Sequence, residues 1–226
     1  MIPKLSPETN LLGRDVSLHI PSGIANLARM PPEHHNIWQL AKQYLRVRNN
    51  DVHTLYSYGI AQILCDEHPE ADREVVLPAM LLHDTGWSSV SEGEILEAIT
   101  PDGGRPDLVL LHEREGVRIA RDVLTQSEWD PVRILRILDI ISEHDSLREA
   151  KSIEDAILKD SDKLWRITPH GVDTIMDWFG LSREQATRLI ASRVHGYLHT
   201  DAARVMAKVL GSVAAIDSSA ERIVLE

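Results

Sequence analysis

From Glu33 onward, the apolar residues of this chain recur every three to four positions, which is the spacing of one face of an α-helix. No stretch alternates apolar and polar residues over the length of a strand, and no internal repeat period appears. At 226 residues the chain is long enough to bury a full hydrophobic core. We therefore predict an all-α fold, built as a single helical bundle.

Proline, glycine and capping residues divide this pattern into segments. Five prolines without periodicity in residues 1–32 predict an extended N-terminal arm, and residues 33–226 then form the helical domain. Gly86 is expected to terminate one helix, Asp130 to cap another, and Ser182 with Gln185 to form a capping box. The predicted helices cover about 34–48, 51–66, 75–82, a short segment after Ser91, 107–127, a segment from Asp130, 153–166, 172–180, 182–198 and 200–214, with the C-terminal helices spanning 171–215.

Charge and composition exclude several classes of function. The net charge is −11 and no basic face is visible, so binding to a nucleic acid polymer is not expected. No apolar run approaches the ~18 residues of a membrane span, and the first thirty residues lack the pattern of a signal peptide. The single cysteine, Cys65, fits a reducing compartment, so we expect a cytoplasmic protein. The apolar stripes of the C-terminal helices are equally compatible with packing inside one chain and with a homodimer.

The chain contains 11 histidines, and four of them fall beside the apolar stripes of four separate predicted helices. A single buried histidine is usually a hydrogen-bonded core residue, but burying four on converging helices is costly unless each finds a partner. Imidazole is the commonest protein ligand of metals. The four residues are His53, His83, His112 and His144, whereas His34, His35 and His68 are expected to be solvated.

Aspartates accompany these histidines. Asp84 directly follows His83, and Asp160 and Asp162 lie near the end of a later helix. Helical phase favours Asp160 as the inward carboxylate because it continues the stripe of Ile153, while Asp162 lies nearer the face of Trp165. A mixed set of imidazoles and carboxylates suits Fe, Mn or Zn better than Ca²⁺, so the pattern predicts a transition-metal site.

The ordered set of His53, His83-Asp84 and Asp162 resembles the H…HD…D signature of the HD-domain superfamily of metal-dependent phosphohydrolases. The local contexts are similar as well: Ala-Met-Leu-Leu-His-Asp-Thr-Gly ends one predicted helix, and Ser-Asp-Lys-Leu resembles the family's aspartate segment. The resemblance covers about residues 34–170, with a metal-site core at about 50–170.

The resemblance implies a ligand set. His53, His83, Asp84 and Asp162 would bind one divalent metal, with Asp160 behind the ligands, although helical phase leaves the choice between the two aspartates open. His112 and His144 match extra histidines of the members that hold two metals, so one or two ions per chain are expected, with Asp84 as the bridge. Asp84 and Lys163 are then the expected catalytic residues.

The same resemblance implies hydrolysis of a phosphate ester of a small molecule, and we expect a nucleotide. Arg114 and Arg118 flank His112, and Arg166 follows Lys163, so these cations are candidates to bind the phosphate. Trp87 is a further candidate for substrate binding because it follows the predicted metal-binding turn. It also stands where the cyclic-dinucleotide phosphodiesterases of the superfamily have a lysine, which disfavours that substrate.

Two other functions remain open on the sequence alone. Some HD-domain proteins with the same six ligands hold a mixed-valence di-iron centre and act as oxygenases. A regulatory module that binds a nucleotide without hydrolysing it is the third hypothesis, although a complete ligand set argues against it.

Overall fold

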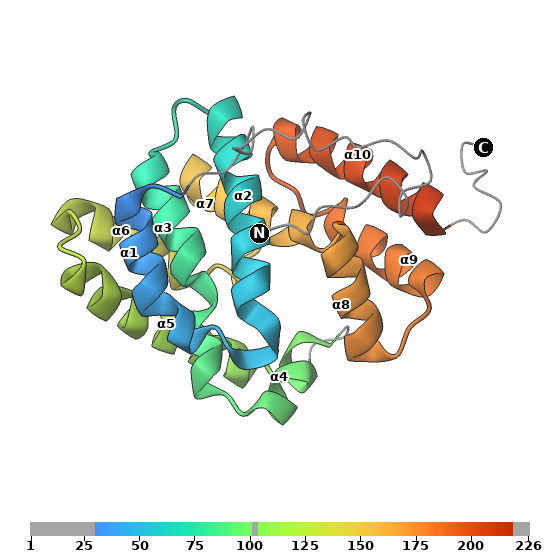
Figure 1. Ribbon diagram of the computed structural model, residues 1–226, viewed down its shortest axis with the longest axis horizontal. Coiled ribbons are helices and arrows are strands. Elements are labelled where there is room, and N and C mark those ends of the chain that lie inside the picture. Colours follow the sequence, from blue (N-terminus) through green and yellow to red (C-terminus); the bar gives the residue numbers. More distant parts are fainter. Residues whose placement is uncertain (1–29, 101–103, 219–226) are drawn as a thin grey trace, which may run out of the picture.

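The computed structural model describes residues 30–100 and 104–218, which are helical and contain no β-strand (Figure 1). The prediction of an all-α fold is confirmed. Most of the predicted N-terminal arm lies outside the described residues.

Ten α-helices form the described part of the chain (Figure 1). They are α1 (Pro32–Ala41), α2 (Asn50–Glu67), α3 (Arg73–Leu82), α4 (Glu92–Ile99), α5 (Pro106–Gln126), α6 (Pro131–Ile141), α7 (Ile153–Trp165), α8 (Pro169–Phe179), α9 (Arg183–Val194) and α10 (Asp201–Ser218).

Side-chain caps explain where several helices begin. The Asp130 carboxylate accepts a hydrogen bond from the backbone N–H of Arg133, as predicted for the start of α6. Ser182 and Gln185 form the predicted capping box of α9. At the other end of a helix, Gly180 adopts φ 62° and terminates α8 in the left-handed conformation that favours glycine.

The predicted helix over 34–48 is shorter in the structure. Helix α1 ends at Ala41, and two 3₁₀ turns, Lys42–Tyr44 and Val47–Asn49, lead into α2. Arg48 and Asn49 have φ values of 55° and 58°, so their backbone is left-handed and cannot continue a right-handed helix. The predicted helix over 182–198 is also shorter, because α9 ends at Val194.

Helices α2 and α7 pack together in the middle of the molecule (Figure 1). Helices α1, α3, α5 and α6 lie on one side of this pair, and α8, α9 and α10 lie on the other. One apolar cluster runs from Ile37 of α1 to Ala207 of α10, and a smaller one around α4 includes Trp87. Helix α3 is buried along eight of its ten residues, so its C-terminal end delivers the next residues, His83 and Asp84, into the interior.

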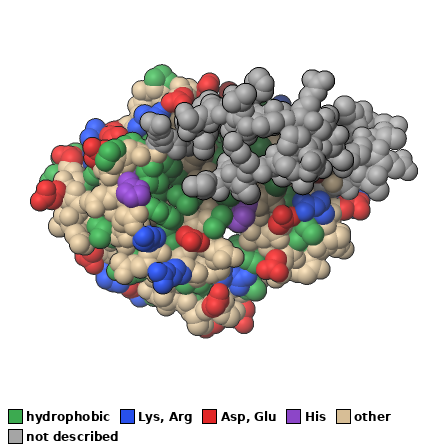
Figure 2. Space-filling model, in the orientation of Figure 1, with side chains coloured by type: hydrophobic (Ala, Val, Ile, Leu, Met, Phe, Trp, Pro, Cys, Tyr) green, Lys and Arg blue, Asp and Glu red, His purple; other side chains and the backbone are tan. Residues whose placement is uncertain are grey.

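The surface carries charges of both signs. Figure 2 shows acidic and basic side chains interspersed over the visible face. No described helix is both long and apolar enough to cross a membrane.

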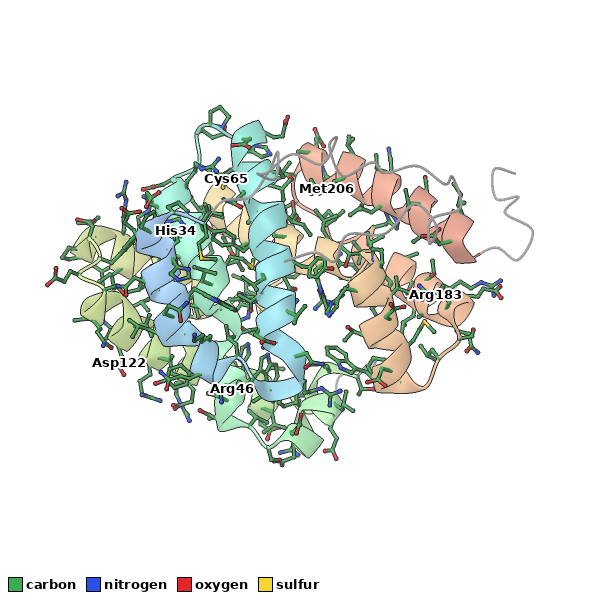
Figure 3. All side chains as sticks on the ribbon, in the orientation of Figure 1. His34, Arg46, Cys65, Asp122, Arg183 and Met206 are labelled. Atoms are coloured by element: carbon green, nitrogen blue, oxygen red, sulfur yellow. The ribbon has the colours of Figure 1, made fainter. Side chains whose placement is uncertain are left out.

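The prediction of a solvated side chain for His34 is wrong. His34 lies on α1 (Figure 3) and is 1% exposed. Its Nδ1 lies 2.7 Å from the Tyr58 hydroxyl. The reason is that α1 begins before His34, so His34, Ile37 and Ala41 share its inward face.

Candidate metal centre

Seven histidine and aspartate side chains converge at the centre of the bundle. They come from α2, from the 3₁₀ turn η4 (His83–Ser89), from α5, from the turn after α6 and from α7. We call His53, His83 and Asp162 the first ligand set, and His112, His144 and Asp145 the second ligand set; Asp84 lies between them.

The first ligand set places two imidazole nitrogens and one carboxylate around a common point. The Nε2 atoms of His53 and His83 lie 3.3 Å apart. Asp162 Oδ1 lies 3.3 Å from His53 Nε2 and 3.9 Å from His83 Nε2. Metal–ligand bonds of about 2.0–2.2 Å place the donor atoms of one ion at separations of this order.

The second ligand set has the same composition. The Nε2 atoms of His112 and His144 lie 3.2 Å apart. Asp145 Oδ2 lies 3.6 Å from each of them. Together with one oxygen of Asp84, these atoms all lie within 4.8 Å of one another, so they too can hold an ion.

Asp84 faces both sets with different oxygens. Its Oδ2 lies 3.3 Å from His53 Nε2 and 3.5 Å from His83 Nε2. Its Oδ1 lies 3.6 Å from His112 Nε2 and 3.8 Å from His144 Nε2. The carboxylate is thus placed where it could bridge two metal positions, which is the role that the resemblance implies for it.

Hydrogen bonds to the backbone orient two of the imidazoles. His83 Nδ1 lies 2.8 Å from the carbonyl oxygen of Met80, and His144 Nδ1 lies 2.8 Å from that of Ile141. A carbonyl oxygen only accepts, so Nδ1 carries the proton in both rings, and in the neutral form Nε2 presents a lone pair. Lone pairs and carboxylates that face one another require a cation, which is why this donor set fits a divalent metal.

Tryptophan rings hold the other two imidazoles. His53 packs against the edge of Trp165, with ring centroids 4.4 Å apart. His112 stacks on Trp87, with centroids 4.1 Å apart and planes 9° from parallel. Within the part of the chain that the structure describes, the Nδ1 atoms of both imidazoles are buried without a hydrogen-bond partner.

The electrostatics reflect the crowding of these groups. Burial disfavours charge on Asp84, but the adjacent imidazoles of His83, His144 and His53 outweigh it and hold the pKa of this carboxyl well below its usual range. Burial also disfavours charge on Asp162, and there Arg166 and His53 hold the pKa well below its usual range. Burial likewise opposes protonation of His53, yet hydrogen bonds to Asp162 and Asp84 raise its pKa to about 9. The pKa of His144 rises to about 10, because the charges of Asp145 and Asp84 outweigh its burial.

A close backbone contact brings Asp84 to the second ligand set. A Cβ atom on Gly86 would lie 1.9 Å from the carbonyl oxygen of His112 and 2.5 Å from the backbone nitrogen of Gly116. Only glycine therefore allows η4 to approach α5 this closely. The prediction that Gly86 terminates a helix is wrong, because α3 already ends at Leu82 and the chain continues as a 3₁₀ turn. The role of Gly86 is this close contact.

Asp162, rather than Asp160, lies among the histidines. The Asp160 carboxylate accepts hydrogen bonds of 2.8 Å from the backbone N–H groups of His199 and Thr200 and from the Thr200 hydroxyl. It thus supports the start of α10, and the expectation that it lies behind the metal ligands is corrected. Helical phase was misleading because α7 is buried on several faces. Burial of a residue on α7 therefore does not show whether its side chain lies beside the histidines.

Asp145 was not among the predicted ligands. It follows His144 in the turn after α6, and Glu113 of α5 holds that turn in place. Glu113 Oε1 accepts hydrogen bonds of 3.0 Å and 2.8 Å from the backbone N–H groups of Asp145 and Ser146. The available signal was a carboxylate adjacent to a predicted ligand, the same arrangement that drew attention to His83-Asp84.

A family model for the HD domain matches residues 50–167, which is more than half of the chain. The chain belongs to the HD-domain family. Comparisons with curated proteins and with solved structures find no match. The matched region contains every member of both ligand sets and Asp84.

Two cavities adjoin the metal centre of this HD domain. The aromatic cavity, about 400 Å³, contains His53, Asp84, Asp145 and Asp162 in its lining, and its further walls include Trp87, Trp165, Trp178, Phe179 and Arg48. The cationic cavity, about 340 Å³, contains His144, Asp145 and Asp162, together with Arg148, Lys163, Arg166 and Arg193. Asp145, Asp162, Arg166 and Arg193 line both, so the two cavities meet at the metal centre.

The predicted substrate-binding residues divide into two groups. Arg166, Lys163 and Trp87 line these cavities. Arg114 and Arg118 line neither; their side chains are 73% and 58% exposed, and both pair with Glu115. They lie two and six residues after His112, so the helical turn of about 100° per residue points them away from the face that carries His112.

Proposed function

We propose that this HD domain is a metal-dependent phosphohydrolase that cleaves a phosphate ester of a small molecule, with a nucleotide as the substrate class. The observation that carries the proposal is the position of Asp84, which presents one oxygen to each of two histidine–aspartate sets and lines the aromatic cavity, whose walls also include Arg166 and Arg193. HD domains are mostly phosphohydrolases, which supports the same activity.

The residues of the centre fit one or two divalent ions of Fe, Mn or Zn. Such an ion lowers the pKa of a bound water toward 7, and so supplies hydroxide at neutral pH. The first ligand set would hold one ion, the second ligand set the other, and Asp84 both. In this role Asp84 is a catalytic residue through its contact with the ions that act on the substrate.

Cationic side chains around the centre would receive the phosphate. Arg166 donates a 2.9 Å hydrogen bond to Asp162 Oδ2 and lines both cavities, so it is placed to orient a phosphoryl oxygen beside the first ligand set. The Lys163 ammonium donates to the carbonyl oxygen of Lys159 at 3.3 Å and also lines the cationic cavity. We propose that Lys163 stabilises negative charge that develops on the phosphate or on the leaving oxygen.

The aromatic cavity supports a nucleotide as the substrate class. Trp178 and Phe179 lie in the same wall, and the Arg48 guanidinium stands 4.9 Å above the Trp178 ring. Flat apolar surfaces and a stacked guanidinium are suited to an aromatic base. Trp87 contributes less of such a surface, because one face of its ring is covered by His112.

Metal content and phosphate release test the proposal together. Protein purified without oxygen would be analysed by mass spectrometry for metals, then assayed with that metal on a panel of nucleotides. We expect about two ions per chain and phosphate release. His83→Ala should lose metal and activity together, while His35→Ala, which changes an exposed histidine of α1 bonded to Gln39, should retain both.

The outcomes separate the alternatives. Two irons per chain without phosphate release from any ester would favour an oxygenase. Nucleotide binding without metal or turnover would favour a regulatory module.

A further inference from the structure

The cationic cavity is lined by four cationic side chains. Arg148, Lys163, Arg166 and Arg193 line it, and the two carboxylates among its described lining residues, Asp145 and Asp162, belong to the ligand sets. The chain as a whole has 35 acidic against 24 basic residues. A local excess of cations in an acidic protein is therefore a feature of this cavity and not of the general composition.

Three of these cations have no ion pair within residues 30–100 and 104–218. Arg166 pairs with Asp162, but Arg148 donates to the carbonyl oxygen of Gly196 and Lys163 to that of Lys159. Arg193, on α9, makes no hydrogen bond or ion pair with another described side chain. Since like charges repel, an anion in the cavity would stabilise the arrangement.

The geometry also holds Arg148 at the wall of the cavity. Its guanidinium lies 4.3 Å from the centre of the Tyr197 ring, and Tyr197 itself lines the cavity. A guanidinium stacked on an aromatic face keeps the N–H donors in its own plane available, and these donors form a fork that fits two phosphate oxygens. Arg148 and Arg193 come from different elements, so the fold brings them together.

The two cavities share their walls at the metal centre, and this fixes how a substrate would lie. A scissile phosphoryl group at the ligand sets would adjoin both cavities, because Asp145 and Asp162 line both. We propose that the substrate carries a second phosphate group, bound by Arg148 and Arg193 in the cationic cavity, so that its class is a nucleoside diphosphate or triphosphate rather than a monophosphate. This inference rests on the proposed function, because it assumes that a phosphoryl group binds at the metal centre.

Three small probes test the second phosphate subsite independently of turnover. Calorimetry on the Mn²⁺-loaded full chain would compare methylphosphonate, phosphonoacetate and methylenediphosphonate, which carry one phosphonate, a phosphonate with a carboxylate, and two phosphonates. Charge-assisted hydrogen bonds to two arginines predict that the diphosphonate binds about tenfold or more tightly than the other two. Equal binding of phosphonoacetate would show that the subsite takes a carboxylate, and equal binding of all three would show that no subsite exists; either result overturns the proposal.

Variants separate the subsite from metal chelation by the diphosphonate. The double variant Arg148→Gln, Arg193→Gln should lose the preference for the diphosphonate while keeping its affinity for methylphosphonate. Arg188→Gln is the matched control, since Arg188 is an exposed arginine of the same helix α9 that pairs with Glu184 and lines neither cavity. A preference that survives in the double variant would come from the ions alone and would overturn the subsite.

The phosphate-release assay, run in parallel, separates a failure of the second phosphate subsite from a failure of the proposed phosphohydrolase activity. Hydrolysis of nucleotides with an unchanged diphosphonate preference in the double variant would refute the subsite and leave the phosphohydrolase intact. A preference lost in the double variant, without hydrolysis of any ester, would support the subsite and refute the activity.

Discussion

The two ligand sets are built to one plan, although their residues come from unrelated positions in the chain. Each contains an imidazole fixed by a backbone carbonyl three residues earlier, His83 in one and His144 in the other. Each contains a second imidazole packed on a tryptophan, and each contains one aspartate. Asp84 completes both.

The sets differ in how their aspartates are held. Asp162 is 13% exposed and bonded through its second oxygen to Arg166. The Asp145 side chain is 36% exposed, and only its backbone is held, by the hydrogen bond from its N–H group to Glu113. Ligands that are fixed before binding lose less entropy when the ion arrives. We therefore expect the first ligand set to bind its ion more tightly, and the second ligand set to be the more accessible to solvent and substrate.

Removal of the shared carboxylate should have the largest effect. In Asp84→Ala both ions lose an oxygen ligand, and we expect metal affinity to fall by more than the 10–100-fold typical of residues behind the ligands, with activity lost as well. Mass spectrometry of metals and the phosphate-release assay measure this. A variant that keeps two ions would show that Asp84 is not the bridge.

Loss of one histidine from the second ligand set should leave the first ligand set able to bind its ion. His112→Ala is expected to reduce the metal content from about two ions to about one. An unchanged metal content would refute the two-metal arrangement, and a complete loss would show that the two sets do not bind independently.

Glu113 offers a smaller and more selective change. In Glu113→Ala the turn that carries Asp145 loses its acceptor, and we expect the weaker ion to bind about 10–100-fold less tightly while the other is unaffected. Titration with a metal chelator would resolve the two ions. Glu115→Ala is the control, because Glu115 lies on the same helix but pairs with Arg118 on the outer face. Equal weakening of both ions in Glu113→Ala would contradict the separation of the two sets.

The smallest effect concerns the metal-free protein and its stability at alkaline pH. His53 and His144 have pKa values raised to about 9 and about 10, above the ordinary value of 6.5, so their protonation stabilises the folded state. This contribution is complete below pH 6.5 and is lost as the pH rises through 9 and 10.

Thermal unfolding in the presence of a chelator, between pH 6 and 10, would measure this loss. We expect Tm to fall across that range without metal, and to fall less with metal, because metal binding requires deprotonated imidazoles. A Tm that stays constant or rises in the metal-free protein would contradict the assignment. The control is the double variant His53→Gln, His144→Gln, whose Tm should depend less on pH.

The residue pattern predicts the helical class, the four histidines and Asp84, and the resemblance to the HD-domain superfamily adds Asp162, so that six of the seven residues at the centre are named in advance. Histidines beside apolar stripes can be recognised from spacing alone, because a buried imidazole is conspicuous against Leu and Ile. Asp145 escaped because it sits in a turn, where periodicity carries no information about direction. Its position depends on Glu113, which is 32 residues away in the chain.

Two other errors show when helical phase can separate one residue from another. On α7 several faces are buried, so continuity with Ile153 and Ile157 could not show which carboxylate meets the histidines. On α5 only one face is inward, and the phase of Arg114 and Arg118 relative to His112 places them outside the centre, although their nearness to His112 in the sequence made them candidates. Phase discriminates between residues only on a helix that has a solvent side.

The contact between Gly86 and α5 has a consequence for how the centre tolerates change in the core. The distance between η4 and α5 is set by a contact between backbone atoms, where Gly86 meets the His112 carbonyl and the Gly116 nitrogen. Substitutions that change side-chain volume elsewhere in the interior alter rotamers and cavities. They do not change the distance at which these two backbone segments meet. The interior of the bundle can thus vary in sequence while the two ion positions keep their separation.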